Sequence, residues 1–399
     1  MSLPLFLMSF ILLHIPCRAN LEHMWVAQKK LNKKNKSSCM SFSRIPVSAE
    51  RSSSCRLAWL RGLVLASLGL LLVGLSGCAS GPARKDAGEL VWPMAPEQAR
   101  IRFVAEYHGQ RDLSDKENFR AALLGEEQAG LALEKPYGVT ASADGKLIYV
   151  TDTKLHSIVV FDIEKKEVHP LQTDAHGALY NPLEICLDQQ GKIFVSDAVR
   201  KEVLVLSPEG KTLMALGKQE EIGRPTGLAL DEARNRLYVS DTAKHRILAY
   251  DLGGKFLFAF GERGSEPGQV NYPVNLAVDH DGNLLVTDSG NFRIQVFDGE
   301  GKFVNTFGQL GDTYGAFSRP KGIGVDSDNN IYVVDAAFSN FQIFNRDGKI
   351  LLFVGAMGRE PGMFWLPTGI FVDRMDRVYV VDSINARIQI FQYLKDKGG

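Results

Sequence analysis

The chain is poor in cysteine, and this scarcity narrows its chemistry. It has five cysteines in 399 residues, and four of them lie before residue 80. These are Cys17, Cys39, Cys55 and Cys78, which leaves Cys186 alone in the rest of the chain. A disulfide framework needs pairs, so we expect none in the folded part. No Cys-x-x-Cys, Cys-x-x-Cys-His or His-Glu-x-x-His motif occurs, which excludes simple zinc, c-type haem and metalloprotease sites.

Other motifs and an excess of positive charge are also missing. The sequence contains no Gly-x-Ser-x-Gly elbow and no phosphate-binding loop. The net charge is zero, but residues 1–61 hold ten of the 46 basic residues and two of the 46 acidic ones. The remainder is therefore acidic, with 36 basic against 44 acidic residues. Because binding to a phosphate backbone needs a basic surface, we expect no nucleic-acid partner.

The longest apolar run, from Gly62 to Gly77, is too short for a comfortable transmembrane helix. Arginines precede it, and Leu75-Ser76-Gly77-Cys78 ends it, as in a secretory signal. These four residues resemble the lipobox of bacterial lipoproteins, which implies acylation of Cys78 as the new N-terminus. Ala79 after the cysteine favours the outer membrane by the same resemblance. The alternative is an uncleaved anchor with a chance cysteine.

These signals divide the N-terminal part of the chain. A conventional signal begins near Met40, so we interpret residues 1–39 as a non-native extension from an over-extended start. Residues 40–77 are then the lipoprotein signal peptide, and residues 78–98 are a lipidated tether.

From residue 135 onward the sequence repeats itself six times. Each copy has a proline, an aspartate fifteen or sixteen residues later, and a large apolar residue nine positions after that. The prolines are Pro136, Pro182, Pro225, Pro273, Pro320 and Pro367. The aspartates, 44 to 47 residues apart, are Asp152, Asp197, Asp241, Asp288, Asp335 and Asp382. Periods of this size indicate a propeller or a solenoid.

Each copy contains four short segments rich in β-branched and aromatic residues. In the third copy these segments are 227–230, 237–240, 246–250 and 255–260. Clusters of Asp, Asn and Gly separate such segments, as turns between strands do. Four antiparallel strands in about 46 residues make one propeller blade. The fold class is therefore all-β, a six-bladed β-propeller of four-stranded antiparallel blades.

The ends of the array indicate how the ring closes. The sixth copy stops near Tyr393, after its third strand, and residues 99–109 ahead of the first copy resemble an unattached fourth strand. Pairing of the two closes the ring and leaves no sheet edge at the seam. We therefore place the propeller at 99–393 and a tail at 394–399. A capping box at Ser114–Glu117 predicts a short helix over 114–124.

Three motifs carry a resemblance to a known family. They are Pro320–Asp326, Asn330–Asp335 and Arg293–Asp298. They resemble NHL repeats, and the resemblance covers residues 100–393. It implies the propeller fold, but NHL propellers include enzymes, protein-binding modules and RNA-binding modules, so it leaves the function open.

The regular positions are expected to be structural, whereas the exceptions are candidates for function. An aspartate at the same place in every blade is expected to accept backbone N–H bonds in the turn that follows. Two residues after each proline, four copies carry glycine, but the second has Glu184 and the fourth has Asn275. Both are expected at the mouth of the central channel, two blades apart, where they could converge on one ligand.

A carboxylate and an amide oxygen suit a hard cation such as Ca²⁺. The arrangement resembles the six-bladed gluconolactonases and paraoxonases, which implies a metal held by Glu184 and Asn275, although no equivalent of their catalytic acid or base is visible. Two alternatives stay open: both residues line a water-filled channel, or Lys321 neutralises Glu184. Phe338 and Phe341 depart from the pattern of neighbouring copies and are candidates for an exposed patch that binds a partner.

The leading hypothesis is a monomeric, non-enzymatic binding or scaffolding propeller. It is anchored by its lipid in the bacterial cell envelope, at the outer membrane and facing the periplasm, with an envelope protein as partner. The alternative is a calcium-dependent hydrolase or lactonase that acts at the channel mouth.

Overall fold

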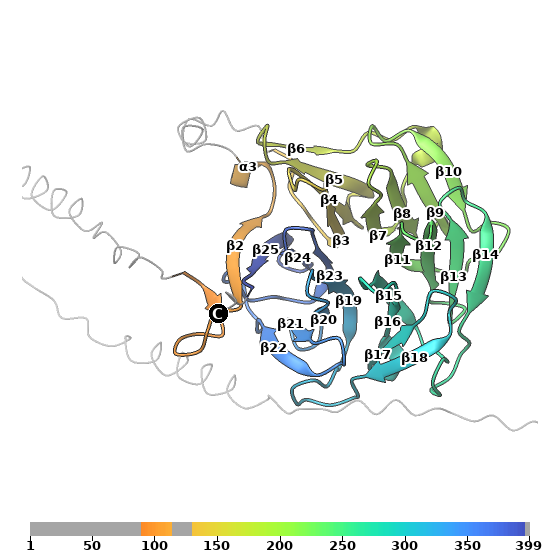
Figure 1. Ribbon diagram of the computed structural model, residues 1–399. Helices are drawn as coiled ribbons and strands as arrows, with labels where there is room; N and C mark the ends of the chain where they lie inside the picture. The colour runs from red at the N-terminus through yellow and green to blue at the C-terminus, as the bar shows by residue number, and fades with distance from the viewer. Residues whose placement is uncertain (1–88, 114–129, 396–399) are drawn as a thin grey trace, which may run out of the picture. The chain divides into compact units, whose positions relative to one another are not determined.

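The computed structural model describes residues 89–113 and 130–395. These residues form six antiparallel sheets arranged in a ring, shown in Figure 1. The extension at 1–39, the signal peptide, Cys78 and the helix expected at 114–124 lie outside the described residues. None of the described helices is long and apolar enough to cross a membrane.

Each sheet is one blade. The blades are numbered 1 to 6 in the order in which their inner strands occur in the sequence. The inner strands are β3 (Pro136–Ala141), β7 (Pro182–Leu187), β11 (Pro225–Asp231), β15 (Pro273–Val278), β19 (Pro320–Val325) and β23 (Pro367–Val372). The second strands are β4 (Leu147–Asp152), β8 (Ile193–Asp197), β12 (Arg236–Asp241), β16 (Leu284–Asp288), β20 (Ile331–Asp335) and β24 (Arg377–Asp382).

The outer half of each blade follows the same order. The third strands are β5 (Ser157–Asp162), β9 (Glu202–Leu206), β13 (Arg246–Asp251), β17 (Arg293–Phe297), β21 (Asn340–Phe344) and β25 (Arg387–Tyr393). The fourth strands are β6 (Glu167–Pro170), β10 (Thr212–Leu216), β14 (Phe256–Phe260), β18 (Phe303–Phe307), β22 (Ile350–Val354) and β2 (Ile101–Tyr107). The short helices are α3 (Gln110–Leu113), η1 (Ala175–Gly177) and η2 (Ser289–Asn291).

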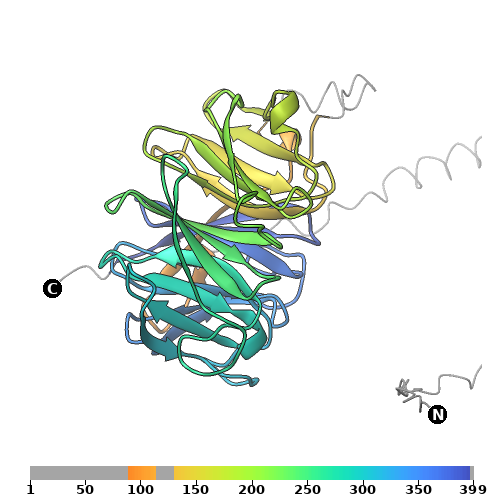
Figure 2. The same ribbon diagram turned by 90° about the vertical axis from the view of Figure 1, so that its right-hand side faces the viewer.

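The register predicted from the repeats is confirmed. In every blade the aligned proline at the start of the inner strand lies opposite the aligned aspartate at the end of the second strand. Consecutive inner strands contact one another around the whole ring, including β23 with β3. Figure 2 shows the ring from the side, with β10 and β14 turned toward the viewer.

The core lies between the blades. Each hydrophobic cluster draws its side chains from two neighbouring sheets, as when Phe341 of β21 contacts Phe391 of β25 with ring centroids 5.4 Å apart. Both faces of every blade are therefore covered. This explains why second strands such as β20 are buried at every position instead of alternating with polar residues.

The N-terminal strand closes the ring, as predicted. β2 pairs antiparallel with β25, so the first and last described parts of the chain share blade 6 (Figure 1). A fifth strand, β1 (Val91–Trp92), pairs with β2, and the Trp92 ring packs against Phe391 at 5.7 Å. The fold thus extends into the segment 78–98 that we expected to be only a tether.

Candidate functional site at the propeller axis

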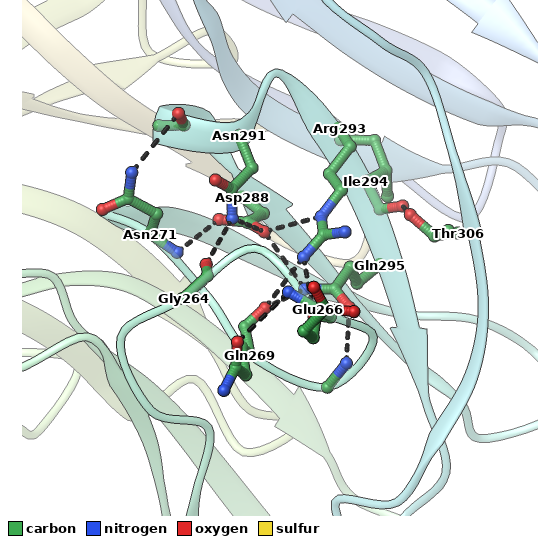
Figure 3. Close-up of polar contacts among 12 residues, drawn as sticks. Gly264, Glu266, Gln269, Asn271, Asp288, Asn291, Arg293, Ile294, Gln295 and Thr306 are labelled. Atoms are coloured by element: carbon green, nitrogen blue, oxygen red, sulfur yellow. Dashed lines mark hydrogen bonds and ion pairs between the residues drawn. The ribbon is translucent and has the colours of Figure 1, made fainter.

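The recurring aspartates fix the turns and loops of their own blades, as Asp288 shows in Figure 3. Its Oδ1 accepts a hydrogen bond from the Asn271 backbone N–H at 2.6 Å. Its Oδ2 accepts from Arg293 Nε at 2.9 Å and from Gln295 Nε2 at 3.1 Å. Every polar atom that reaches this buried carboxylate belongs to the same blade or to the loop leading into it. The carboxylate therefore acts as a structural anchor.

The first blade shows the general pattern most simply. Asp152 Oδ1 accepts from the backbone N–H groups of Lys154 and Leu155 in the following turn, which confirms the prediction. Asp152 Oδ2 accepts from the N–H groups of Glu134 and Lys135, a second role that the sequence did not indicate. The carboxylate thus joins the turn between strands two and three to the residues before the proline. We call the side of the ring that carries these turns and the loops before the prolines the proline face.

The glycines two residues after the prolines are needed for packing between inner strands. A Cβ on Gly227 would lie 2.5 Å from the Asn275 Cα, and one on Gly322 would lie 2.6 Å from the Thr368 backbone oxygen. Contacts this short with backbone cannot be relieved by a side-chain rotation. Glycine is therefore required there by the close approach of the next blade, rather than only by an open channel.

Glu184 and Asn275 converge, as their positions in the repeat suggested. Asn275 Nδ2 donates to Glu184 Oε2 at 2.6 Å, which joins β7 of blade 2 to β15 of blade 4. Each residue is only 6% exposed. Burial raises the pKa of the Glu184 carboxyl to about 8, against the smaller opposing effects of hydrogen bonds from the Ile185 N–H and Asn275. At neutral pH this carboxyl is therefore mostly protonated.

The pair does not form a complete calcium site. Calcium takes six to eight oxygen ligands, whereas Glu184 Oε2 is engaged by Asn275, and Oε1 accepts a long 3.3 Å bond from the Ile185 N–H. Within residues 89–113 and 130–395, no group of three or more His, Cys, Asp or Glu side chains is placed to hold a metal. The metal assignment to Glu184 and Asn275 stays a prediction.

Lys321 does not pair with Glu184. Its Nζ lies 5.7 Å from the centroid of the Tyr137 ring, a cation–π contact that joins β19 of blade 5 to β3 of blade 1. Burial, together with the smaller effects of the positive charges of Arg319 and Arg224, lowers the pKa of Lys321 to about 8. We call Tyr137, Glu184, Asn275 and Lys321 the axial cluster, because their two contacts each join blades two steps apart in the ring.

Three blades place a basic residue immediately before the inner-strand proline. Lys135, Arg224 and Arg319 occupy this position in blades 1, 3 and 5, and all three are exposed. The other three blades have Asn181, Tyr272 and Leu366 there. We call Arg224 and Arg319 the rim arginines. The alternation of basic and non-basic residues at this position is visible in the aligned repeats. Only the closed ring, however, shows that these positions surround a common axis.

The prediction for Phe341 is wrong. Phe341 is fully buried, with its ring 6.1 Å from Phe364 in the core between blades 5 and 6. It occupies the position of Ile294 in the preceding blade, which is also buried, so it is a larger core residue and not part of a surface patch. Phe338 lies partly buried in the turn held by Asp335, on the proline face.

Exposed apolar side chains are distributed unevenly between the two sides of the ring. In the described residues, the large hydrophobic side chains that are exposed in the turns and loops of the opposite face are Met94 and Met375. The proline face has nine. They are Tyr180, Val199, Tyr272, Leu310, Tyr314, Met357, Met363, Leu366 and Ile384. The remaining exposed ones lie on the fourth strands at the outer rim.

Family comparisons agree with this architecture. A family described as "6-bladed beta-propeller" matches residues 145–259 and 326–395, and the NHL repeat matches residues 270–297. No curated protein is significantly similar in sequence.

Solved structures share the fold at low identity. A Bacteroides thetaiotaomicron protein of unknown function is 16% identical, with a TM-score of 0.53, over 65% of this chain and 70% of its own. Kuenenia stuttgartiensis hydrazine synthase is 12% identical, with a TM-score of 0.50, over 68% and 99%. Virginiamycin B lyase from Staphylococcus aureus is 13% identical, with a TM-score of 0.49, over 74% and 100%. At these identities the Bacteroides protein and the hydrazine synthase indicate a similar fold alone.

Proposed function

Because the chain is a six-bladed β-propeller with NHL-type repeats, we propose that it is a non-enzymatic binding or scaffolding module whose proline face engages a protein partner. The fold serves enzymes and binding modules alike, so it does not choose between them. The choice depends on the surface and on the chemistry at the axis.

The observation that carries the proposal is the collection of exposed apolar side chains on the proline face. Tyrosine and methionine are enriched at the centres of protein interfaces, and this face presents Tyr272 and Met357. A concentration of exposed apolar side chains on one face is typical of an interaction surface. The opposite face, with Met94 and Met375, lacks a comparable set among the described residues.

We also propose a cellular location for the propeller. An acylated Cys78 would tether a monomeric propeller to the outer membrane, facing the periplasm, where an envelope protein would be its partner. The lipobox-like Leu75–Cys78 supports this placement. The alternative of a calcium-dependent hydrolase or lactonase needs a donor set that Glu184 and Asn275 do not complete, so the geometry favours binding.

Site-specific photocrosslinking in cells that produce the full chain tests the proposal. A photoreactive amino acid replaces Tyr272 or Leu366 on the proline face, and Met375 or Leu257 in two control variants on the opposite face and the outer rim. We expect one shared adduct with an envelope protein from both proline-face positions and none from the controls. Adducts spread evenly over all four positions, or none from Tyr272 and Leu366, would refute the assignment.

A further inference from the structure

Positive charge without a partner gathers where the axis meets the proline face. In the part of the chain that the structure describes, no ion pair or hydrogen bond engages the side chains of Arg224, Arg319 or Lys321. Arginines at a different position, the start of a third strand, are paired, as Arg293 is with Asp288 and Arg387 with Asp382. The three cations are therefore available to a ligand.

Each rim arginine lies within electrostatic range of Lys321. Both rim arginines lower the pKa of Lys321. They also act to lower the pKa of Tyr137, but burial has the larger effect and the pKa of Tyr137 is raised to about 12. They come from blades 3 and 5, whereas Tyr137 comes from blade 1. Side chains from three alternating blades thus interact electrostatically in one small region. Their positive charges repel one another, and a bound anion would relieve this repulsion.

The groups beneath the rim suit an anion rather than a cation. Glu184, which faces the same region from β7, is mostly protonated at neutral pH and so adds little negative charge.

We propose that the proline-face end of the axis binds a small multivalent oxyanion through Arg224, Arg319 and Lys321, above the Glu184–Asn275 pair. The ligand class is a di- or tricarboxylate or a phosphate, because guanidinium groups bind these oxygens with paired hydrogen bonds. This site is independent of the protein partner proposed above. A protein without a crosslinked partner could still bind the anion, and a protein with a crosslinked partner could lack anion binding, so the two experiments can fail separately.

Calorimetric titration of the full chain tests the site, with citrate and inorganic phosphate as the two probes at low salt and pH 7. We expect saturable binding of at least one probe to the wild-type protein. The double variant Arg224→Ala/Arg319→Ala should weaken it at least tenfold, since charge-assisted hydrogen bonds are lost. The matched control Arg374→Ala removes an exposed arginine from the opposite face and should change the affinity less than twofold.

Lys321→Met is the second variant and should also weaken binding at least tenfold. Because both substituted arginines are exposed, the double variant keeps the test valid even if Lys321→Met does not fold. Citrate alone or phosphate alone would define the ligand class. No saturable binding of either probe to the wild-type protein, or an equal loss in Arg374→Ala, would overturn the proposal.

The pH dependence of binding gives an independent readout. The charged and titratable groups at the site are Lys135, Tyr137, Glu184, the rim arginines and Lys321; β15 and β23 contribute none. Loss of the Lys321 proton and ionisation of Glu184, both near pH 8, should weaken anion binding between pH 7 and pH 9. Lys321→Arg should keep its charge and make this decline shallower, with the remainder due to Glu184, and a decline as steep as in the wild type would contradict the role given to Lys321.

Discussion

Replacing Glu184 by glutamine should stabilise the protein increasingly as the pH rises. The folded carboxyl has a pKa of about 8 against an ordinary value of 4.5. Between these pH values the folded state holds a proton that the unfolded chain releases, so wild-type stability falls as the pH rises through this window. At about 1.4 kcal/mol per pKa unit, the full cost at pH 9 is at most about 5 kcal/mol.

Glutamine avoids this cost because it does not ionise, and its side-chain oxygen can still accept the bond from Asn275 Nδ2. At pH 5 the wild-type carboxyl is already mostly protonated, so the two proteins should differ by less than about 1 kcal/mol. At pH 9 Glu184→Gln should be more stable by roughly 3 kcal/mol or more. Lys321 titrates in both proteins, and its contribution cancels in the comparison.

Urea unfolding of both proteins at pH 5, 7 and 9 measures the difference in free energy. The control is Glu266→Gln, in which an exposed glutamate of the loop before blade 4 is changed. It should show no growing advantage with pH. A constant difference between wild type and Glu184→Gln, or a wild type that is the more stable at pH 9, would refute the argument that burial controls this carboxyl.

Four further outcomes are expected. Deletion of residues 99–109 should aggregate the protein by opening the edge of β25, and a soluble monomer with unchanged Tm would contradict closure by β2. Gly227→Ala should cost about 1–3 kcal/mol in urea unfolding, because its Cβ would press on the Asn275 backbone, and a neutral effect would show that the inner strands can separate. Cys78→Ser should release the protein from membranes or block its processing, and mass spectrometry of a native N-terminus that begins elsewhere without a lipid would exclude the lipoprotein assignment. Millimolar calcium should leave the Tm unchanged at pH 7, since Glu184 is mostly protonated, and a calcium-dependent rise that disappears in Glu184→Gln would restore the metal site.

The blades themselves were predictable from the sequence, because their information is local and occurs six times. The pairing of Pro225 with Asp241 needs only a short hairpin and a carboxylate that accepts nearby N–H groups, and both are visible as spacing. Closure by residues 99–109 was also predictable, since an array that lacks a fourth strand at one end had a spare strand at the other.

Contacts across the axis were decided by the tertiary structure. Glu184 and Asn275 are 91 residues apart and were expected at one place, but only the closed ring shows that they hydrogen-bond to each other. The same closure sends Lys321 to Tyr137 instead of Glu184. Departure from the repeat marked Phe341 as special, yet packing between blades buries it. The repeat sets where each residue lies within its blade, whereas the distances between blades depend on how six sheets pack around one axis.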